Sequence, residues 1–247
     1  TELKVINAGT TGAITFSDPA VTLSGDATDL AVALAGTTNH NATVTVTNAS
    51  AYTLTELKVI NAGTAGSISF QDTTVALSGD ATDLAVALAG TTNHNGAVTV
   101  TNASAYTATE LQTINNGTSG TISLDDTTVA LSGSGTVVAA ALAGTFAGGK
   151  GHTGAVEVTG NDYTATELKT INAGTTGTIS LDDTTVALSG DATDLAVALA
   201  GTFAGGKGHT GAVTVSNASA YTVTELKVIN AGTTGAITFS DVTVALS

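Results

Sequence analysis

The sequence contains no cysteine, methionine, tryptophan or arginine, and its only proline is Pro19. Because it has no cysteine, it can form no disulfide framework, and either redox compartment would suit it. Six lysines face 20 acidic side chains, which gives a formal net charge of −14. We therefore expect no binding to nucleic acid, since such binding relies on basic side chains that neutralise phosphates. No apolar run is long enough for a signal peptide or a membrane-spanning helix, so we expect no membrane span in this segment.

What the sequence does contain is a short motif that returns at a nearly constant interval. Thr-Glu-Leu, Thr-Asp-Leu or a close variant opens nine repeats of about 27 residues, which start at residues 1, 28, 55, 82, 109, 136, 166, 193 and 224. A fixed period of this length is typical of repeat architectures, in which each repeat buries its apolar face against its neighbours. The sequence therefore predicts a single continuous repeat array over residues 1–247. Both ends fall inside the repeat pattern, so we expect this stretch to belong to a longer protein.

The repeats alternate between two types, so the full period is 54 residues. First-type repeats contain Thr-Glu-Leu-Lys-Val-Ile-Asn-Ala-Gly, and second-type repeats contain Thr-Asp-Leu-Ala-Val-Ala-Leu-Ala-Gly. Both patterns predict a short helix that ends at a glycine. The first-type helices should begin with capping boxes, in which a threonine hydroxyl and a glutamate carboxylate bond each other's backbone N–H groups. These boxes pair Thr53 with Glu56, Thr107 with Glu110, Thr164 with Glu167, and Thr222 with Glu225.

Alternating apolar residues after each helix predict short strands. Ile14 and Phe16 flank a threonine in a first-type repeat, Val44 and Val46 do so in a second-type repeat, and a further strand is expected near Leu23. We therefore expect an α/β fold, a repeat solenoid of nine coils. Each coil would run helix, strand, strand, with parallel strands paired between coils. The alternative is a row of separate 54-residue α/β domains joined by linkers.

Four histidines recur in the loops that lead from a second-type helix to its strand, namely His40, His94, His152 and His209. Neighbouring histidines would lie two coils apart, roughly 10 Å. That distance is too great for two of them to share one zinc ion. We therefore predict exposed loop histidines that bind no metal.

Two of these loops, residues 145–154 and 202–211, carry a four-residue insertion with an aromatic and a basic side chain. Their Gly-Gly-Lys-Gly run resembles a phosphate-binding loop only superficially, because it follows a helix and lacks the Gly-x-x-x-x-Gly-Lys-Ser/Thr pattern. Loops often carry recognition, so we predict that these two are contact sites. The residues concerned are Phe146, Lys150, His152, Phe203, Lys207 and His209.

Nothing in the sequence groups side chains for catalysis. The Gly-x-Ser-x-Gly nucleophile motif does not occur, and near-identical repeats do not build one unique active site. We therefore expect no catalytic residue, no cofactor-binding residue and no metal ligand, and hence no enzyme. Structural calcium is the remaining alternative, because the chain is acidic, although it lacks both the EF-hand loop and the glycine-rich calcium nonapeptide.

The repeat pattern as a whole, represented by TELKTINAGTTGTISLDDTTVALSGDATDLAVALAGT at residues 166–202, resembles a known class of sequence. It is similar to the tandem repeats of giant bacterial cell-surface proteins, the adhesin-like proteins of cyanobacteria and other Gram-negative bacteria. The resemblance covers the whole chain and transfers no functional residue. It implies an extracellular or cell-surface location. The implied partners are the chain itself, adjoining repeats of a longer chain, or surface glycans.

We therefore expect a non-enzymatic extracellular structural segment, which would serve as a stalk, a surface layer or a filament. One alternative is an adhesin or carbohydrate-binding module that uses the loops 145–154 and 202–211. Another is an ice-binding solenoid, because Thr43, Thr45 and Thr47 would present threonine in ranks on one face of a strand.

Overall fold

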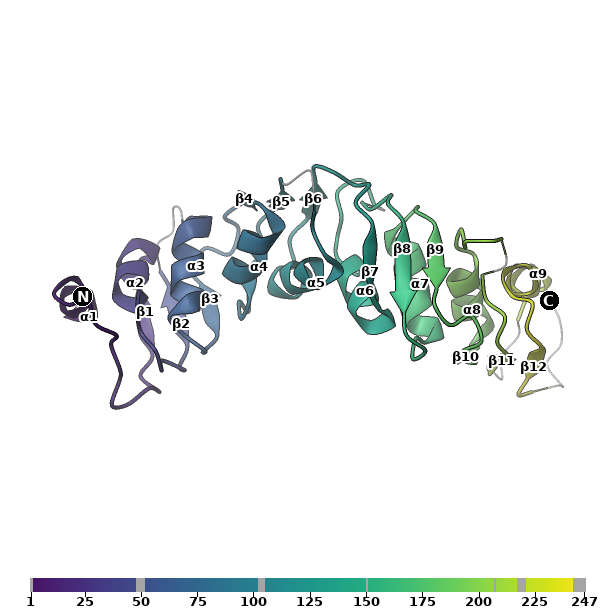
Figure 1. Cartoon of the computed structure of the whole chain (residues 1–247), viewed down its shortest axis with the longest axis horizontal. Coiled ribbons are helices and arrows are strands. Elements are labelled where there is room, and N and C mark those ends of the chain that lie inside the picture. The colour runs from purple at the N-terminus through teal and green to yellow at the C-terminus, as the bar shows by residue number, and fades with distance from the viewer. Residues whose placement is uncertain are drawn as a thin grey trace. The chain divides into compact units, whose positions relative to one another are not determined.

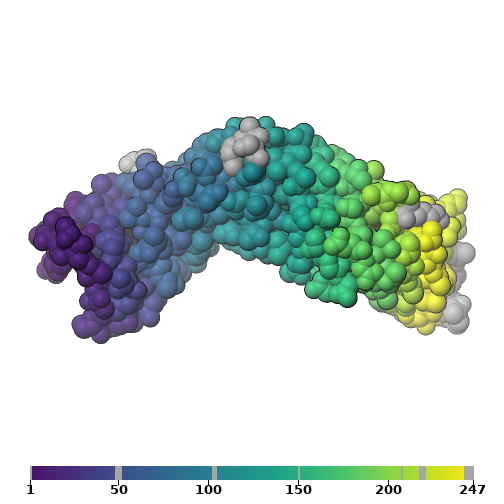
Figure 2. All heavy atoms as spheres, in the orientation of Figure 1, coloured from purple at the N-terminus to yellow at the C-terminus, as the bar shows by residue number. Residues whose placement is uncertain are grey.

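The computed structural model describes residues 2–47, 52–101, 105–149, 151–206, 208–216 and 221–241. The chain forms two compact modules. The N-terminal module comprises residues 1–106 and 113–125, and the C-terminal module comprises residues 107–112 and 126–247. In both modules, short helices and short strands alternate along the chain (Figure 1). Within each module, successive repeats pack side by side (Figure 2).

Each repeat contributes one helix, which gives nine helices among the described residues. The first-type helices begin as their capping boxes predict: Thr53 accepts a bond from the N–H of Glu56, and the Glu56 carboxylate accepts one from the N–H of Thr53. The same reciprocal bonds occur at the other three boxes. The helices are α1 (Glu2–Ala8), α2 (Ala27–Leu34), α3 (Leu54–Ala62), α4 (Ala81–Leu88), α5 (Ala108–Gly117), α6 (Gly135–Leu142), α7 (Ala165–Gly174), α8 (Ala192–Leu199) and α9 (Val223–Gly232).

The strands form four separate parallel sheets of three strands each. Every sheet combines the second strand of a first-type repeat, the strand of the following second-type repeat and the first strand of the next first-type repeat. In the N-terminal module the sheets are β1 (Leu23–Gly25), β2 (Val44–Val46) and β3 (Ile68–Phe70), then β4 (Leu77–Gly79), β5 (Val98–Val100) and β6 (Ile122–Leu124). In the C-terminal module they are β7 (Leu131–Ser134), β8 (Val156–Thr159) and β9 (Ile179–Leu181), then β10 (Leu188–Gly190), β11 (Val213–Val215) and β12 (Ile237–Phe239).

The fold is therefore the α/β repeat solenoid that the sequence predicts, with one refinement. Equivalent strands of successive coils pair within each sheet, as β2 does with β3, but the pairing does not continue along the whole row, because each sheet ends in a first-type repeat and the next sheet begins in that same repeat. Helices prefer to pack about 8–10 Å apart, whereas strands in a sheet lie about 4.8 Å apart. In a continuous sheet with one strand per repeat, the strands would advance only about half as far per repeat as the helices do. Restarting the sheet every two repeats relieves that mismatch.

The helices pack in unbroken succession within each module. In the N-terminal module α1 packs on α2, α2 on α3 and α3 on α4, and in the C-terminal module α6 packs on α7, α7 on α8 and α8 on α9. Within each module, the described residues do not divide into separate 54-residue domains. The single array over residues 1–247 stays a prediction. None of the described helices is both long and apolar enough to cross a membrane.

Two kinds of polar contact alternate along the row of helices. Where a second-type helix follows a first-type helix, a lysine pairs with an aspartate, as Lys58 does with Asp83 at the α3–α4 interface. An asparagine at the same interface, Asn61, donates to the carbonyl of Val86. Where a first-type helix follows, a threonine instead donates to the capping glutamate, as Thr28 does to Glu56 at 2.6 Å. This alternation gives the 54-residue period a physical basis.

The same contacts recur at the equivalent helix pairs. The lysine–aspartate contact joins Lys4 to Asp29 and Lys169 to Asp194, and the threonine–glutamate contact joins Thr136 to Glu167 and Thr193 to Glu225. One pair of equivalent positions, in α5 and α6, holds Gln112 and Val137, which cannot form an ion pair.

Tight packing between repeats requires glycine at specific loop positions. A Cβ atom on Gly66 would lie 1.9 Å from the carbonyl oxygen of Ala42 in the preceding repeat. At the equivalent position of the first repeat, a Cβ on Gly12 would meet only the Thr10 hydroxyl, at 3.5 Å. The two glycines therefore differ in whether a preceding repeat packs against them.

Substitution of these two glycines tests the packing between repeats. We expect Gly66→Ala to lower the free energy of unfolding by about 1–3 kcal/mol, because the added methyl group forces two backbone segments apart. The matched substitution Gly12→Ala should change it by less than about 0.5 kcal/mol, as an open surface position does. Urea unfolding followed by circular dichroism measures both. Equal destabilisation by the two substitutions would contradict the observed packing.

Candidate functional site

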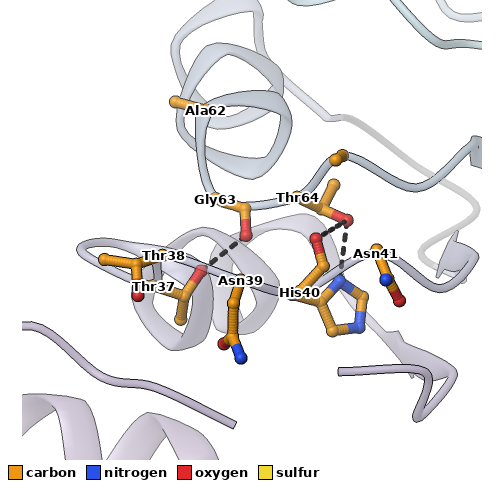
Figure 3. A pocket seen from close by; sticks show the side chains of 9 residues that line it. Thr37, Thr38, Asn39, His40, Asn41, Ala62, Gly63 and Thr64 are labelled. Carbon is orange, nitrogen blue, oxygen red and sulfur yellow. Dashed lines mark hydrogen bonds between the residues drawn. The ribbon is translucent and has the colours of Figure 1, made fainter. Parts of the chain in front are cut away.

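The four histidines are buried between repeats, with exposed fractions of 0–1 %. Each ring bridges three successive repeats, because one nitrogen contacts the repeat before it and the other contacts the repeat after it. In the first case, His40 Nε2 lies 2.8 Å from the carbonyl oxygen of Val21 and Nδ1 lies 2.7 Å from the Thr64 hydroxyl. Figure 3 shows His40 beneath Thr64. The expectation of exposed histidines is therefore wrong, because the loop that carries each ring is covered by the next repeat.

The other three rings make the same contacts at similar distances. Nε2 lies 2.7–2.9 Å from the carbonyl oxygen and Nδ1 lies 2.8–3.0 Å from the threonine hydroxyl. The partners are Val75 and Thr118 for His94, Val129 and Thr175 for His152, and Val186 and Thr233 for His209.

These partners fix the proton on each ring. A carbonyl oxygen can only accept, so Nε2 carries the hydrogen, and Nδ1 accepts from the threonine hydroxyl. Burial lowers the pKa of His94, His152 and His209 below the ordinary value of 6.5, although the bond to the valine carbonyl opposes part of this fall. Since both nitrogens are engaged, neither can act as a metal ligand or as a general base without breaking a bond between repeats.

A pocket of about 230 Å³ opens beside His40, lined by residues 37–41 and 62–65 (Figure 3). Thr37 and Thr64 point across it, but their hydroxyls are bonded to the carbonyl of Gly63 and to His40. A pocket of about 160 Å³ occupies the equivalent place beside His94. Both volumes are below the roughly 300–1,000 Å³ of typical ligand pockets. The pocket is therefore a recurring consequence of repeat packing.

The two long loops hold their aromatic side chains inward. Phe146 and Phe203 are each 5 % exposed. Each loop turns tightly after its phenylalanine: the Gly149 N–H donates to the Phe146 carbonyl at 3.1 Å, and Gly148 has a φ of +78°. A positive φ at that position of a turn favours glycine. The exposed surface of the turn is formed by alanine and glycine, at residues 147–149 and 204–206.

The four described residues among the six predicted for these loops are thus not gathered into an open site. The two phenylalanines and the two histidines are buried, and they were expected to be exposed because they lie in loops. Lys150 and Lys207 lie outside the described residues. One sequence signal could have revealed the buried histidines, namely the threonine that follows each of them 23 or 24 residues later.

The aspartates in the turns after β3, β6 and β9 also accept hydrogen bonds within the protein. Asp72 accepts from the N–H and from the hydroxyl of Thr74, and Asp126 and Asp183 make the same contacts with the threonines two residues later. The threonine side-chain bonds lower the pKa of these three carboxyl groups. Among the described residues, no three histidine, aspartate or glutamate side chains are grouped so that they could hold a metal ion.

The outer faces of the sheets carry rows of hydroxyl groups. Thr45 lies in register between Ser24 and Ser69, and its hydroxyl is 3.3 Å from that of Ser69. Thr214 and Thr238 are similarly paired at 3.1 Å. In the sheet β7–β9 the central position holds Glu157, which accepts from Ser132, so a charge interrupts the row there. Each row spans only the three strands of its sheet.

Comparison with protein-family models, with curated proteins and with solved structures gives no match to this chain.

The buried histidines predict a pH-dependent stability. The unfolded chain should protonate its histidines near pH 6.5, whereas the folded chain resists protonation of His94, His152 and His209. Where the unfolded state binds more protons, stability rises with pH. The contribution of the neutral rings is therefore fully present above about pH 6.5 and declines as pH falls from there towards the lowered pKa values. The urea concentration at the midpoint of unfolding should fall as the pH is lowered from 7.5 to 5. A variant in which His94, His152 and His209 are all replaced by glutamine should show a flatter dependence on pH.

Removing the threonine partner of a histidine should be costly. In Thr118→Val the Nδ1 atom of His94 loses its donor and the Gly120 N–H loses its acceptor while both stay buried, so we expect a loss of about 1–3 kcal/mol in the free energy of unfolding. Thr118→Ser keeps the hydroxyl and should cost less than about 1 kcal/mol, the value of the lost methyl group. Urea unfolding at pH 7.5 compares the two. Similar losses in both variants would show that the hydroxyl bond is unimportant.

Proposed function

We propose that this chain is a non-enzymatic structural segment, a spacer that sets a distance in a stalk, surface layer or filament. The observation that carries the proposal is that its polar side chains link one repeat to the next. The histidines, the capping glutamates and the lysine–aspartate pairs all make their contacts across a boundary between repeats. No buried polar side-chain atom of the described residues lacks a hydrogen-bond partner.

This use of polar groups supports a structural role over a catalytic one. A catalytic site needs a side chain with a perturbed pKa and an open face towards substrate. Here the histidines with lowered pKa values are closed off by the repeats on either side. The turn aspartates Asp72, Asp126 and Asp183 are half-buried, and their carboxylates accept hydrogen bonds from threonines.

We further propose an extracellular or cell-surface location, in keeping with the resemblance to the tandem repeats of giant bacterial surface proteins. The high negative charge and the absence of cysteine and methionine suit that setting. The partners would be adjoining repeats of a longer chain or further copies of this one.

The adhesin alternative is less well supported, since sugar stacking needs an exposed aromatic face and Phe146 and Phe203 are buried. Surface glycans stay a candidate class of partner through the exposed turns of residues 147–149 and 204–206. The outer hydroxyl rows favour a second candidate function, binding to ice. Thermal hysteresis at micromolar protein would support it, and its absence would remove it.

A length measurement tests the spacer role. We expect a variant in which residues 55–108 are duplicated in tandem to be longer by about 16–20 Å, because it gains two helix spacings of about 8–10 Å. A compact protein of the same size would grow by only a few ångströms across, according to the general scaling of domain size. Small-angle X-ray scattering of the two monomers measures the maximum dimension. An increase of only a few ångströms in the maximum dimension would refute the spacer role.

A further inference from the structure

Each threonine that contacts a buried histidine ring has a second acceptor within reach of its hydroxyl group. The Thr64 hydroxyl oxygen lies 2.7 Å from Nδ1 of His40 and 3.4 Å from the backbone carbonyl oxygen of the same histidine. Both contacts start at the Thr64 oxygen in Figure 3. Because a hydroxyl group has one hydrogen, it donates to one of these two acceptors at a time.

The other three histidines have the same second acceptor. Their carbonyl oxygens lie 3.2–3.3 Å from the threonine hydroxyl, slightly closer than at His40. The threonines are Thr118 for His94, Thr175 for His152 and Thr233 for His209. Since the arrangement occurs in both modules, it is a property of the repeat and not of one site.

The threonine oxygen also accepts a hydrogen bond from a glycine in its own repeat. The Gly120 N–H donates to Oγ1 of Thr118 at 3.0 Å, and the equivalent bonds at the other three sites measure 2.9 Å. A hydroxyl oxygen has two acceptor positions, so one is left for a further donor. The hydroxyl can therefore reverse its role towards the ring, accepting from Nδ1 and donating to the carbonyl, while the glycine bond persists.

A protonated ring would find an acceptor for each of its two N–H groups. In His94, Nε2 lies 2.9 Å from the Val75 carbonyl oxygen, and Nδ1 lies 2.8 Å from Oγ1 of Thr118. The His94 carbonyl already accepts from the Ser119 N–H at 2.9 Å, and its second lone pair is available to the Thr118 hydroxyl. The exposed Ser119 hydroxyl, 3.4 Å from the same oxygen, can turn to water instead.

No charged side chain of the described residues shifts the pKa of His94. Burial is the main cause of its lowered pKa, and the bond to the Val75 carbonyl opposes part of the fall. The same two kinds of cause act on the pKa values of His152 and His209. Residues 118–120, which contact His94 from the next repeat, include no ionisable side chain. Protonation therefore costs the burial of a charge and no hydrogen bond.

Two aromatic rings pack against His94. The ring centroids of Tyr52 and Phe70 lie 6.3 Å and 5.9 Å from that of the histidine. Burial, and to a smaller extent the charge of Asp72, raises the pKa of the Tyr52 phenol above its ordinary value of 10.0. Tyr52 is therefore neutral throughout the pH range in which the histidine titrates.

We propose that each histidine–threonine contact is a proton-binding site within the row of repeats. In acid, the Nδ1 lone pair takes up a proton from water, the threonine hydroxyl turns from Nδ1 to the histidine carbonyl, and the new Nδ1–H donates to the threonine oxygen. The N–H bond is the one covalent bond that forms, and the site gains one positive charge. The hydrogen bond between the repeats changes direction but joins the same two atoms.

The consequence is a limit on the stability that the histidines can lose in acid. Their contribution declines between 6.5, the ordinary pKa, and the lowered pKa values of His94, His152 and His209 in the folded chain. Below those values the folded and the unfolded chain both bind the proton, so a further fall in pH removes nothing more through these rings. Neighbouring repeats thus stay joined in mild acid, whatever the row connects.

Nuclear magnetic resonance of the ring nitrogens tests the proposal in the full chain. Nitrogen-15 shifts of labelled histidine distinguish the neutral ring with a proton on Nε2 from the doubly protonated ring. Circular dichroism of the same samples reports whether the chain is folded. We expect His94, His152 and His209 to titrate reversibly below pH 6.5 in the folded chain. Unfolding of the chain before these rings are protonated would overturn the proposal.

The direction of the pKa change in Thr118→Val distinguishes a reversing hydroxyl from a fixed one. A hydrogen bond to a charged group is about twice as strong as one between neutral groups, so loss of a reversing hydroxyl weakens the protonated ring more. We therefore expect the pKa of His94 to fall by about one unit. A hydroxyl that only donates to Nδ1 stabilises the neutral ring alone, and its removal would raise the pKa. A rise or no change overturns the proposal.

The loss of the acceptor of the Gly120 N–H affects both protonation states of Thr118→Val and does not alter this comparison. Thr118→Ser is the matched control, because it keeps the hydroxyl and should leave the pKa of His94 near that of the unaltered chain. His152 is an internal control in the same sample, since its partner Thr175 is unchanged. If Thr118→Val does not fold, Thr175→Val gives the same test at His152, with the same outcome expected and the same outcome excluded.

Discussion

The structure depends on one constraint, which is that helices and strands of the same repeat must advance together although they prefer different spacings. A helix row advances about 8–10 Å per element and a sheet about 4.8 Å. The chain meets this constraint by ending each sheet after three strands and starting another within the same first-type repeat. The two kinds of repeat follow from that arrangement, since only one kind contains the restart. The alternating lysine–aspartate and threonine–glutamate contacts then mark the two kinds of boundary between helices.

The same constraint explains where the polar side chains lie. Loops that run between repeats bring backbone carbonyl groups into the interior, and buried polar groups need partners. His40 and its three counterparts supply a donor to a valine carbonyl on one side and an acceptor for a threonine hydroxyl on the other. Side chains that would suggest chemistry in an ordinary domain are thereby used to hold neighbouring repeats in register. The glycine-containing turns after Phe146 and Phe203 are exposed, whereas Asp72 and Thr45 are half-buried.

A repeat row has a direction, because each helix offers one face to the repeat before it and a different face to the repeat after it. Lys58 and Asn61 of α3 contact the following helix α4, whereas Glu56 of α3 accepts from Thr28 of the preceding helix α2. The two faces of a first-type helix therefore make different polar contacts.

The sequence by itself determined the elements and the fold class. The capping boxes set the helix starts, the alternation at Val44 and Val46 placed the strands, and the fixed period required neighbouring repeats to stack, because these features act over a few residues or repeat regularly. Only the tertiary structure decided that the histidines and Phe146 are buried and that the sheets are interrupted. Those outcomes depend on which loop covers which side chain and on how two packing distances are reconciled. Neither is set by the residues of a single repeat, since the covering groups, such as Thr64 over His40, come from the next one.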